Sequence, residues 1–458
     1  MSVLTDITKG IKTFKLGGIH PPELKELTAG AAIERFPTPR TVNIPLAQHI
    51  GAPAEAIVKR GEEVKKGQMI AKAPSFVSAP VHASVSGKVA KIDNFPHPNG
   101  TQDQMISIQS DGQDEWLEGL NPEAPLPNLD ASKGKEYLEA VKNAGIVGLG
   151  GAAFPSHVKL SPPEDKPIDM LLINGAECEP YLTSDYRVML ENPQEVLYGA
   201  RAFMIILGVE KCIIAIEDNK PEAIEAMREA IDNEADPFQG IGDIGVAVCQ
   251  TKYPQGGEKQ LIAAVLGREV PSGGLPMDVG LVVQNIGTCV AASNAVGRGI
   301  PLIERVVTVA GRKVPNPKNL LVPVGTLFSE LLDYCGYEAV EGSKVLMGGP
   351  MMGKAQRTTE VPVIKGTSGI VVLEPDEMAH FEERPCLRCG RCVEVCPMGL
   401  MPSRLANFSE HDVIEPLSEL GINDCVECGS CAYICPAQRH LVQWIRMGKV
   451  KVRQAEKR

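Results

Sequence analysis

The sequence contains no long hydrophobic run. A membrane-spanning helix needs about 20 consecutive apolar residues, and the longest uninterrupted candidates are the short stretches Phe203–Val209 and Cys212–Ile216. The opening residues, MSVLTDITKGIKTFK, also lack the apolar centre of a secretory signal. We therefore expect a cytoplasmic protein with no transmembrane span, whose attachment to a membrane would depend on a partner.

An excess of positive charge is absent as well. The net charge is −11, with 46 Lys and Arg against 57 Asp and Glu, which argues against nucleic acid as a partner. A basic stretch near the C-terminus is a local exception. It could contact an acidic redox partner or lipid headgroups, or form a solvated tail. Its members are Arg439, Arg446, Lys449, Lys451, Arg453, Lys457 and Arg458.

The length and composition are those of a multidomain globular protein. A chain of 458 residues should divide into three or four domains, and contents of 43% hydrophobic and 22% charged residues are ordinary. Eight of the 13 cysteines fall in two motifs near the C-terminus, which fits a reducing compartment. We interpret most of the others as buried hydrophobic residues: Cys178, Cys212, Cys249, Cys289 and Cys335.

The two cysteine motifs have the same spacing. The first motif is Cys386-x2-Cys389-x2-Cys392-x3-Cys396-Pro397, and the second is Cys425-x2-Cys428-x2-Cys431-x3-Cys435-Pro436. This is the bacterial ferredoxin spacing for a pair of [4Fe–4S] clusters, in which the fourth cysteine of each motif ligates the other cluster. The spacing therefore predicts one cluster on Cys386, Cys389, Cys392 and Cys435, and another on Cys425, Cys428, Cys431 and Cys396.

Zinc and disulfide interpretations of these cysteines are less suitable. Structural zinc prefers two separated C-x2-C pairs that close one tetrahedron. A zinc site does not require a third cysteine two residues further on and a fourth before a proline, and it does not require this motif to occur twice. Disulfides need an oxidising compartment and usually a small secreted domain.

The first part of the chain has short, β-branched segments separated by turns at Gly61, Gly67 and Gly87. This pattern predicts a compact β-sandwich, which resembles the biotinyl/lipoyl-carrier barrel. The carrier lysine motif is absent, because Lys72-Ala73-Pro74-Ser75 occupies the corresponding hairpin. We expect the barrel to have kept its fold, lost the swinging arm, and taken a structural or docking role.

The middle of the chain alternates strands with helices. We expect strands at Asp169–Ile173, Lys211–Ile216 and Gly245–Cys249, with helices at Lys135–Ala144, Pro193–Leu207, Pro221–Ile231 and Glu258–Leu266. The alternation favours a parallel sheet with helices on both faces. A strand–turn–strand segment from Ile303 and a helix at Leu327–Tyr334 then indicate a β-grasp domain. The predicted fold is thus a multidomain α/β chain with domains at 1–120, 130–290, 300–355 and 375–446.

Polar and glycine-rich segments fall where ligands bind α/β sheets, at the carboxyl ends of the strands. Asn174 to Tyr181 follows the first predicted strand, with Asp185 beyond, and Tyr253 to Lys259 opens a helix after the third. A helix N-terminus with flexible glycine amides can cradle phosphate. Gly148–Pro155 could wrap a planar ring or phosphate, although this segment is not a dinucleotide fingerprint because it follows a helix. The alternative is that these segments merely connect elements.

Four segments together resemble the flavin-binding subunit of respiratory complex I: GGAAFPSHVKL, INGAECEPYLTSDYRVM, YPQGGEKQ and VVQNIGT. With the carrier-like barrel in front, and the β-grasp (SLBB) domain and two ferredoxin motifs behind, the domain order resembles the RnfC family. That family is the peripheral subunit of the Rnf ferredoxin:NAD+ oxidoreductase complex. The segment FKLGGIHPPELKELT is also typical of it. The resemblance covers nearly the whole chain.

The resemblance implies FMN as a cofactor and NAD(H) as a substrate. Carried over position by position, the family pattern places Gly150, Gly151, Phe154 and Lys159 along the FMN. Lys159 would lie near the phosphate of the FMN. The residues that would lie beside the flavin ring and the nicotinamide are Asn174, Glu177 and Glu179. The two glutamates would act catalytically by setting the electrostatics of the flavin. The residues that would flank the flavin are Tyr253, Gly257 and Glu258, and those that would hold its phosphate are Asn285 and Thr288.

The sequence departs from the complex I pattern at four places. Ala176 stands for an aspartate, Lys259 for a glutamate and Gln284 for an asparagine, and Glu217-Asp218-Asn219 replaces Arg-Gly-Glu after the middle strand. An acidic strand end would suit a ribose hydroxyl and repel a 2′-phosphate.

The family resemblance implies an enzyme subunit on the cytoplasmic side of the cell inner membrane. It would exchange hydride between NAD(H) and FMN, and single electrons with the two clusters. Its partners would be the membrane-embedded and ferredoxin-like Rnf subunits and, indirectly, ferredoxin, with Na+ or H+ translocated by other subunits. Two alternatives stay open: a subunit of a soluble cobalamin or amino-acid reductase, and a non-catalytic iron–sulfur relay or scaffold. We expect a structural role for Cys178, because flanking carboxylates discourage a thiolate.

Overall fold

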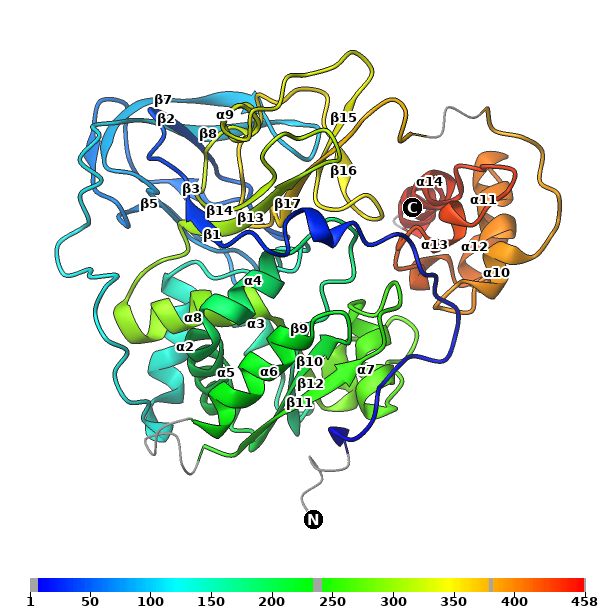
Figure 1. The fold of residues 1–458 in the computed structure, drawn as a ribbon, viewed down its shortest axis with the longest axis horizontal. Helices are drawn as coiled ribbons and strands as arrows, with labels where there is room; N and C mark the ends of the chain where they lie inside the picture. The colour runs from blue at the N-terminus through cyan, green and yellow to red at the C-terminus, as the bar shows by residue number, and fades with distance from the viewer. Residues whose placement is uncertain (1–6, 234–240, 379–381, 457–458) are drawn as a thin grey trace.

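The computed structural model describes residues 7–233, 241–378 and 382–456. Lys457 and Arg458 of the basic tail, and short stretches of three predicted domains, lie outside the described residues. Figure 1 shows a barrel in blue to cyan, an α/β part in green, a mixed sheet in yellow and a helical part in orange to red. The predicted fold class, with these four parts in this order, is confirmed.

The barrel consists of two small antiparallel sheets that enclose apolar side chains. One sheet has the order β2-β8-β7-β4 and the other β3-β5-β6. Alternating residues of β2 and β8, among them Val42, Ile44, Ile106 and Ile108, are fully buried in its core. The strands are β2 (Thr41–Pro45), β3 (Glu55–Ala56), β4 (Glu63–Val64), β5 (Met69–Lys72), β6 (Val81–His82), β7 (Gly87–Pro96) and β8 (Gln102–Ser110).

The α/β part is built on a parallel sheet of order β11-β10-β9-β12. Its strands are buried on both faces by separate apolar clusters, so they appear in the sequence as continuous apolar runs. The strands are β9 (Met170–Gly175), β10 (Lys211–Glu217), β11 (Asp243–Cys249) and β12 (Leu281–Asn285). The longer helices are α2 (Gly134–Asn143), α4 (Ser184–Glu191), α5 (Pro193–Leu207), α6 (Pro221–Asp232), α7 (Glu258–Leu266) and α8 (Ile286–Arg298), and short turns occur at α3 (Ser156–Lys159), η2 (Ala131–Lys133) and η4 (Pro276–Val279).

The mixed sheet has the order β1-β14-β13-β17-β15-β16 and packs against α9 (Phe328–Tyr334). One edge strand, β1 (Ile33–Arg35), comes from the N-terminal side of the barrel and pairs in parallel with β14. The residues before Thr41 therefore lie outside the barrel. The other strands are β13 (Glu304–Ala310), β14 (Lys318–Pro323), β15 (Lys344–Met347), β16 (Lys354–Ala355) and β17 (Gly369–Leu373).

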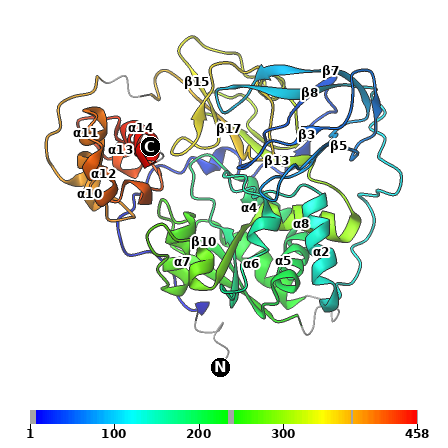
Figure 2. The ribbon, with the colours of Figure 1, turned by 180° about the vertical axis from the view of Figure 1, so that it is seen from behind.

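The helical part carries both cysteine motifs and has its own core, with Leu405, Leu417 and Ile445 buried. Its elements are α10 (Arg391–Glu394), α11 (Pro402–Glu410), α12 (Glu415–Glu419), η5 (Ile422–Asp424), α13 (Ser430–Tyr433) and α14 (Leu441–Glu456). Seen from either side, it lies beside α7 and the β15–β16 end of the mixed sheet (Figures 1 and 2). None of the helices within the described ranges combines the length and apolarity that crossing a bilayer requires.

The N-terminal segment, residues 12–27, runs between the α/β part and the helical part (Figure 1). Lys12 bonds the edge strand β11 through the Val248 carbonyl. Gly18 then donates its amide to the Val395 carbonyl at 2.9 Å, and Ile19 exchanges backbone hydrogen bonds with Tyr253. The segment ends in the short turn η1 (Lys25–Leu27). It therefore ties the cysteine motifs to the sheet.

Candidate functional site

The candidate site lies at the carboxyl edge of the parallel sheet. There β9, β10 and β12 end at Gly175, Glu217 and Asn285. The loops that follow them meet the glycine-rich loop at 148–155 and the loop at 250–257. This edge is where parallel sheets bind ligands, because the loops there diverge and leave backbone groups free.

The glycine-rich loop is held over the start of α8. Leu149 donates its amide to the Thr288 hydroxyl at 3.0 Å, and Thr288 is itself fully buried. Gly150 lies against the Asn285 side chain. Gly151 has φ +102°, and a Cβ there would meet nothing within 4 Å, so the loop faces open space. The backbone at Gly150 and Gly151 therefore borders a space that a phosphate or a planar ring could occupy.

Lys159 and Glu258 lie together at the edge of this space. The ammonium group contacts the Glu258 carboxylate at 2.7 Å and donates to the Val283 carbonyl at 3.2 Å. Glu258 begins α7, directly after Gly257. The structure thus brings together a cation from α3, the N-terminus of α7 and the end of β12.

Two asparagines connect neighbouring loops across the sheet edge. Asn174 donates to the Gly256 carbonyl at 2.8 Å, and Asn285 donates to the Asp185 carboxylate at 2.5 Å. Burial, together with the nearby charge of Glu177, raises the pKa of Asp185 to about 7. The sequence places Asp185 just beyond the first of these loops, and the structure adds its pairing with Asn285.

The carboxylates of Glu177 and Glu179 both bind backbone amides. Glu177, with φ +49°, accepts from the amides of Asp185 and Tyr186 at 2.7 and 3.1 Å, so it caps α4. Glu179 accepts from the amides of Met351 and Met352 at 3.0 and 2.7 Å. Burial raises the pKa of Glu179 to about 7, although these two hydrogen bonds act in the opposite direction.

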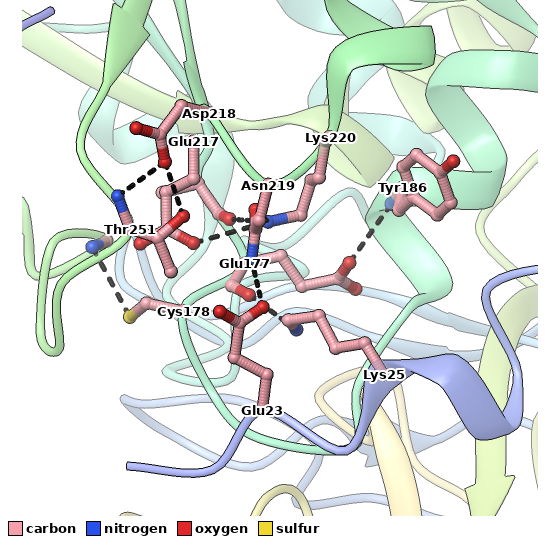
Figure 3. A network of polar contacts seen from close by, with 12 residues as sticks. Glu23, Lys25, Glu177, Cys178, Tyr186, Glu217, Asp218, Asn219, Lys220 and Thr251 are labelled. Carbon is pink, nitrogen blue, oxygen red and sulfur yellow. Dashed lines mark hydrogen bonds and ion pairs between the residues drawn. The ribbon is translucent and has the colours of Figure 1, made fainter. Parts of the chain in front are cut away.

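Two buried lysines fix the loop that carries these glutamates (Figure 3). The Lys25 ammonium donates to the backbone carbonyls of Glu177, Glu179 and Leu182 at 2.8, 2.9 and 2.5 Å. Lys220 donates to the Ala176 carbonyl at 2.6 Å and contacts Glu217 at 3.2 Å. Sequence reasoning missed both lysines. Lys25 is visible in the sequence only as one of three lysines in the N-terminal segment, with Lys12 and Lys15, far from the loop in the chain.

The acidic strand end after β10 is engaged within the protein. Glu217 is 1% exposed and pairs with Lys220. Asp218 accepts hydrogen bonds from the amide and the hydroxyl of Thr251 at 2.8 and 2.6 Å (Figure 3). A ribose hydroxyl would have to compete with these partners for either carboxylate.

Cys178 and Tyr253 connect the sheet edge to the second cysteine motif. The two residues share an apolar cluster with Ile19, Met351 and Cys428. Tyr253 is 2% exposed and donates from its hydroxyl to the Cys428 carbonyl at 2.7 Å. The Cys178 thiol accepts from the Gly256 amide at 3.3 Å, and burial, followed by the charges of Glu217 and Glu179, raises its pKa. The site therefore continues directly into the helical part.

The eight motif cysteines line two small cavities. The cavity beside Tyr253 is lined by Cys396, Cys425, Cys428 and Cys431. The other is lined by Cys386, Cys389, Cys392 and Cys435. Each cavity thus takes three cysteines from one motif and the fourth from the other.

A larger cavity, of about 430 Å³, lies between the barrel, α4, α8 and β13. Its walls include Lys66, Asp185, Gly287 and Arg305. None of the residues implied for FMN or NAD(H) lines it, although it borders the far side of the glycine-rich loop at Leu149. We do not assign the cofactor to it.

Four families match successive parts of the chain. Residues 12–113 match the RnfC barrel sandwich hybrid domain and residues 141–294 the Nuo51 FMN-binding domain. Residues 306–355 match the SLBB domain and residues 377–440 the 4Fe-4S dicluster domain.

Similar proteins extend over nearly the whole chain. A protein of Clostridium ljungdahlii, from its proton-translocating ferredoxin:NAD(+) oxidoreductase complex, is 52% identical over 98% of this chain and 96% of its own length. The chain belongs to the RnfC family. A protein of the Na(+)-translocating ferredoxin:NAD(+) oxidoreductase complex of Acetobacterium woodii is 46% identical, over 95% of this chain and 96% of its own length. A protein of the ion-translocating oxidoreductase complex of Rhodobacter capsulatus is 44% identical, over 96% of this chain and 84% of its own length.

A solved structure shares the fold of this RnfC-family chain. The NAD+-reducing [NiFe]-hydrogenase in its air-oxidized state has a chain that superposes with a TM-score of 0.52. The match covers 72% of the RnfC-family chain and 69% of the hydrogenase chain, at 17% identity. At that identity the likeness concerns the fold alone.

The residues present in the RnfC-family chain fit both cofactors that its domains imply. For FMN, the glycine-rich loop leaves room in front of Gly151, and the buried Nε2 of Gln284 at the end of β12 has no partner among the described residues. For the clusters, each cavity offers four soft thiolates. In a four-iron cluster each thiolate binds a different iron, so four cysteines around one cavity are the expected arrangement.

The departures from the complex I pattern have local explanations in the RnfC-family chain. The buried Ala176 provides the carbonyl that Lys220 binds. Lys259 donates to the Pro271 carbonyl at 3.2 Å. Ala176 therefore brings no charged side chain to the sheet edge, and the Lys259 ammonium is bound by the Pro271 carbonyl.

Proposed function

We propose that this chain is the NAD(H)-reacting subunit of a membrane-bound ferredoxin:NAD+ oxidoreductase complex that translocates Na+ or H+ through other subunits. The observation that carries the proposal is the continuous arrangement from the glycine-rich loop, through Tyr253, to the second cysteine motif. The names of three relatives, which span nearly all of this chain, support it. FMN, when bound, supplies the exchange between a hydride and two single electrons.

The chain's own residues hold and orient the ligands. Gly150, Gly151 and Phe154 would enclose the flavin ring, and Lys159, Asn285 and the N-terminus of α8 would stabilise its phosphate. The contact of 2.7 Å between the Lys159 ammonium and the Glu258 carboxylate supports this role, because it fixes the position of the cation beside the proposed phosphate site. Thr288 would act by fixing the loop through Leu149, since its hydroxyl is buried there.

Glu177 and Glu179 set the position of the loop beside the flavin ring and nicotinamide. Glu177 caps α4 and Glu179 binds the amides of the 351–352 segment. Neither geometry offers a proton donor aimed at open space. Their contribution would be to orient Asn174 and the loop and to shape the local electrostatics, as oriented charges do in a site shielded from water.

We assign Cys425, Cys428, Cys431 and Cys396 to the cluster nearer the flavin, and Cys386, Cys389, Cys392 and Cys435 to the farther cluster. The lining of the two cavities supports this pairing. The Tyr253–Cys428 hydrogen bond supports the order, because it joins the flavin domain to the first of these cavities. Electrons would thus pass between the flavin and the second motif before reaching the first motif's three cysteines.

The chain would lie on the cytoplasmic face of the cell inner membrane, where NAD(H) is found. It would contact the membrane-embedded and ferredoxin-like subunits there. The relatives' names support this placement, because each describes one part of an ion-translocating complex.

Anaerobic reconstitution with iron, sulfide and FMN, followed by NADH, tests the proposal. We expect loss of the flavin's visible absorption, followed by reduction of both clusters. Lys159→Met should weaken FMN retention by about 10- to 100-fold, the value of one charge-assisted hydrogen bond. Lys166→Met, which breaks an exposed contact with Asp278, is the matched control. Flavin that is not retained, or that NADH cannot reduce, would leave only the relay interpretation.

A further inference from the structure

The two cysteine motifs have opposite surroundings. In the second motif, the stretch Cys428–Cys431 is buried. A Cβ on Gly429 would lie 2.9 Å from the Met351 carbonyl, and Tyr253 covers Cys428. Cys396 of the first motif, which lines the same cavity as the second motif, is covered by the N-terminal segment, since a Cβ on Gly17 would lie 2.6 Å from its carbonyl carbon. The second motif therefore faces the rest of the chain.

The first half of the first motif faces solvent. Every residue from Pro385 to Arg391 is exposed, including Cys386 and Cys389. Leu387, between them, is 67% exposed, the highest value among the large exposed hydrophobic residues. It lines the cavity of the first motif together with Arg388. Burying an exposed apolar side chain against another molecule is favourable. A molecule that covered Leu387 would lie at the edge of the cluster site.

Cations without an ion pair flank Leu387 in the chain. Arg384, Arg388 and Arg391 are exposed, and across the described residues none of the three forms an ion pair. Arg384 lies beside the cavity, because its amide bonds the Ala437 carbonyl. Two exposed carboxylates, Glu382 and Glu394, are near in sequence. Apart from the cluster ligands, the exposed charged side chains of this face are three arginines against two glutamates, whereas the net charge of the chain is −11.

The C-terminal basic stretch is different, because its cations are largely neutralised. Arg439 pairs with Glu383 and Glu410. The remaining pairs are Arg446 and Lys449 with Glu427, and Lys451 with Asp412. Among the described residues of the helical part, Arg384, Arg388 and Arg391 form no ion pair and fall at or just before the first motif, whereas Arg404 and Arg453 are isolated exposed cations elsewhere. The described part of the basic tail has only Arg453 without an ion pair, so it is the weaker candidate for an acidic partner.

We propose that Leu387 and the three arginines form the docking face for an acidic electron-carrier protein, one that itself holds an iron–sulfur centre. The inference rests on the proposed function, in which the first motif carries the outer cluster. A single electron crosses the interface, so that the centre on one side is oxidised as the centre on the other is reduced. No bond forms or breaks, and no proton is transferred.

A protein fits this face better than a lipid surface does. The cations and the apolar residue are grouped closely around two cluster ligands, so whatever covers them also covers the cluster. A bilayer there would insulate the cluster from any acceptor. An acidic protein would be steered to the site by charge and would shorten the distance for the electron.

The test uses the full chain with both clusters and FMN, and a small acidic two-[4Fe–4S] ferredoxin as the probe. We expect binding that weakens as salt rises. In the triple variant Arg384→Gln, Arg388→Gln, Arg391→Gln, the Kd should rise by about tenfold or more and its salt dependence should flatten. The matched control is Lys59→Gln, Arg60→Gln, Lys88→Gln, three exposed cations on the barrel, which should bind like the wild type. Leu387→Ala should weaken binding without changing the salt dependence.

Iron content, cluster EPR and NADH-dependent flavin reduction are measured on the same samples. NADH-dependent flavin reduction and the EPR signal of the inner cluster should be unchanged in the triple variant, because Arg388 lines only the cavity of the first motif. If they are normal and the ferredoxin binds the triple variant as tightly as the barrel control, or does not bind the wild type, the docking proposal is wrong. Binding to anionic phosphatidylglycerol vesicles is measured in parallel. If the triple substitution reduced vesicle binding and left ferredoxin binding unchanged, a lipid surface would be favoured and the docking proposal would be wrong. If the wild type retains no iron or flavin, the proposed function itself fails.

Discussion

Tyr253 donates its hydroxyl to the backbone carbonyl of Cys428 at 2.7 Å, although the two residues are 175 positions apart in the chain. Both are buried. The bond joins the loop after β11 to the second cysteine motif, and it is a direct contact between the part of the chain that matches the FMN-binding domain and a proposed cluster ligand. It is therefore the relationship on which the proposed order of the two clusters chiefly depends.

Tyr253→Phe should weaken this junction. The change leaves a buried carbonyl without its donor, which costs about 1–3 kcal/mol. We expect normal iron and FMN content, a lower unfolding midpoint of the helical part, and slower cluster reduction after the flavin is reduced, measured by stopped-flow absorption. Tyr433→Phe is the matched control, because Tyr433 is 50% exposed. Equal effects of the two changes would show that the Tyr253 hydroxyl has no special role.

Glu179 should give the junction a pH dependence. Burial raises its pKa to about 7 from the ordinary 4.5, so the folded protein binds the proton more tightly than the unfolded chain. Stability from this group is fully present below about pH 4.5 and is lost as the pH rises through about 7. Between pH 6 and 8, the wild type should lose unfolding free energy relative to Glu179→Gln. The control is Glu118→Gln, at an exposed position. Parallel stability curves for wild type and Glu179→Gln would contradict the assignment.

Gly17 should be intolerant of a side chain. Its φ is +65°, and a Cβ would lie 2.6 Å from the Cys396 backbone. Gly10 has nearly the same φ, +66°, but open space around it. Both alanine variants should cost about 1 kcal/mol for the backbone conformation. Only Gly17→Ala should also loosen the N-terminal segment, seen as faster iron loss to a chelator. Similar iron loss from Gly10→Ala would mean that strain alone is responsible.

Cys178 should be dispensable for chemistry. Burial, followed by the charges of Glu217 and Glu179, raises the pKa of its thiol, so little thiolate is present near neutral pH. Cys178→Ala should leave NADH-dependent flavin reduction largely intact, with a small loss of stability from the packing beside Gly256. Abolished flavin reduction, with flavin still bound, would give the thiol a direct role.

Much of the fold could be predicted from local pattern. The helices Pro193–Leu207 and Glu258–Leu266 have the predicted bounds, and the strands β9, β10 and β11 differ from prediction by one or two residues at their ends. These elements have strong apolar periodicity or continuous buried runs. The strand Leu281–Asn285 is visible in the sequence only as part of a motif, because it is short and continues directly into α8.

Contacts between distant segments could not be predicted in the same way. The pairing of Ile33–Arg35 with β14, and the Lys25 hydrogen bonds to the Glu177–Leu182 loop, depend on how the chain returns to itself. The motif spacing predicts two sets of cysteines, and the members of each set line one cavity. It could not indicate that one set faces Tyr253 and the other faces solvent, because burial of either motif is decided by the N-terminal segment and the loop at Met351.

The fourth cysteine of each motif offers the most direct test of the account. EPR and iron analysis after NADH reduction should be compared for Cys396→Ser and Cys435→Ser. We predict that Cys396→Ser damages the cluster built mainly by the second motif and leaves the outer cluster present but not reduced by NADH. Cys435→Ser should damage the outer cluster and leave the inner one reducible. If Cys396→Ser instead removed the first motif's cluster, or if NADH still reduced the outer cluster without the inner one, the pairing or the order would be wrong.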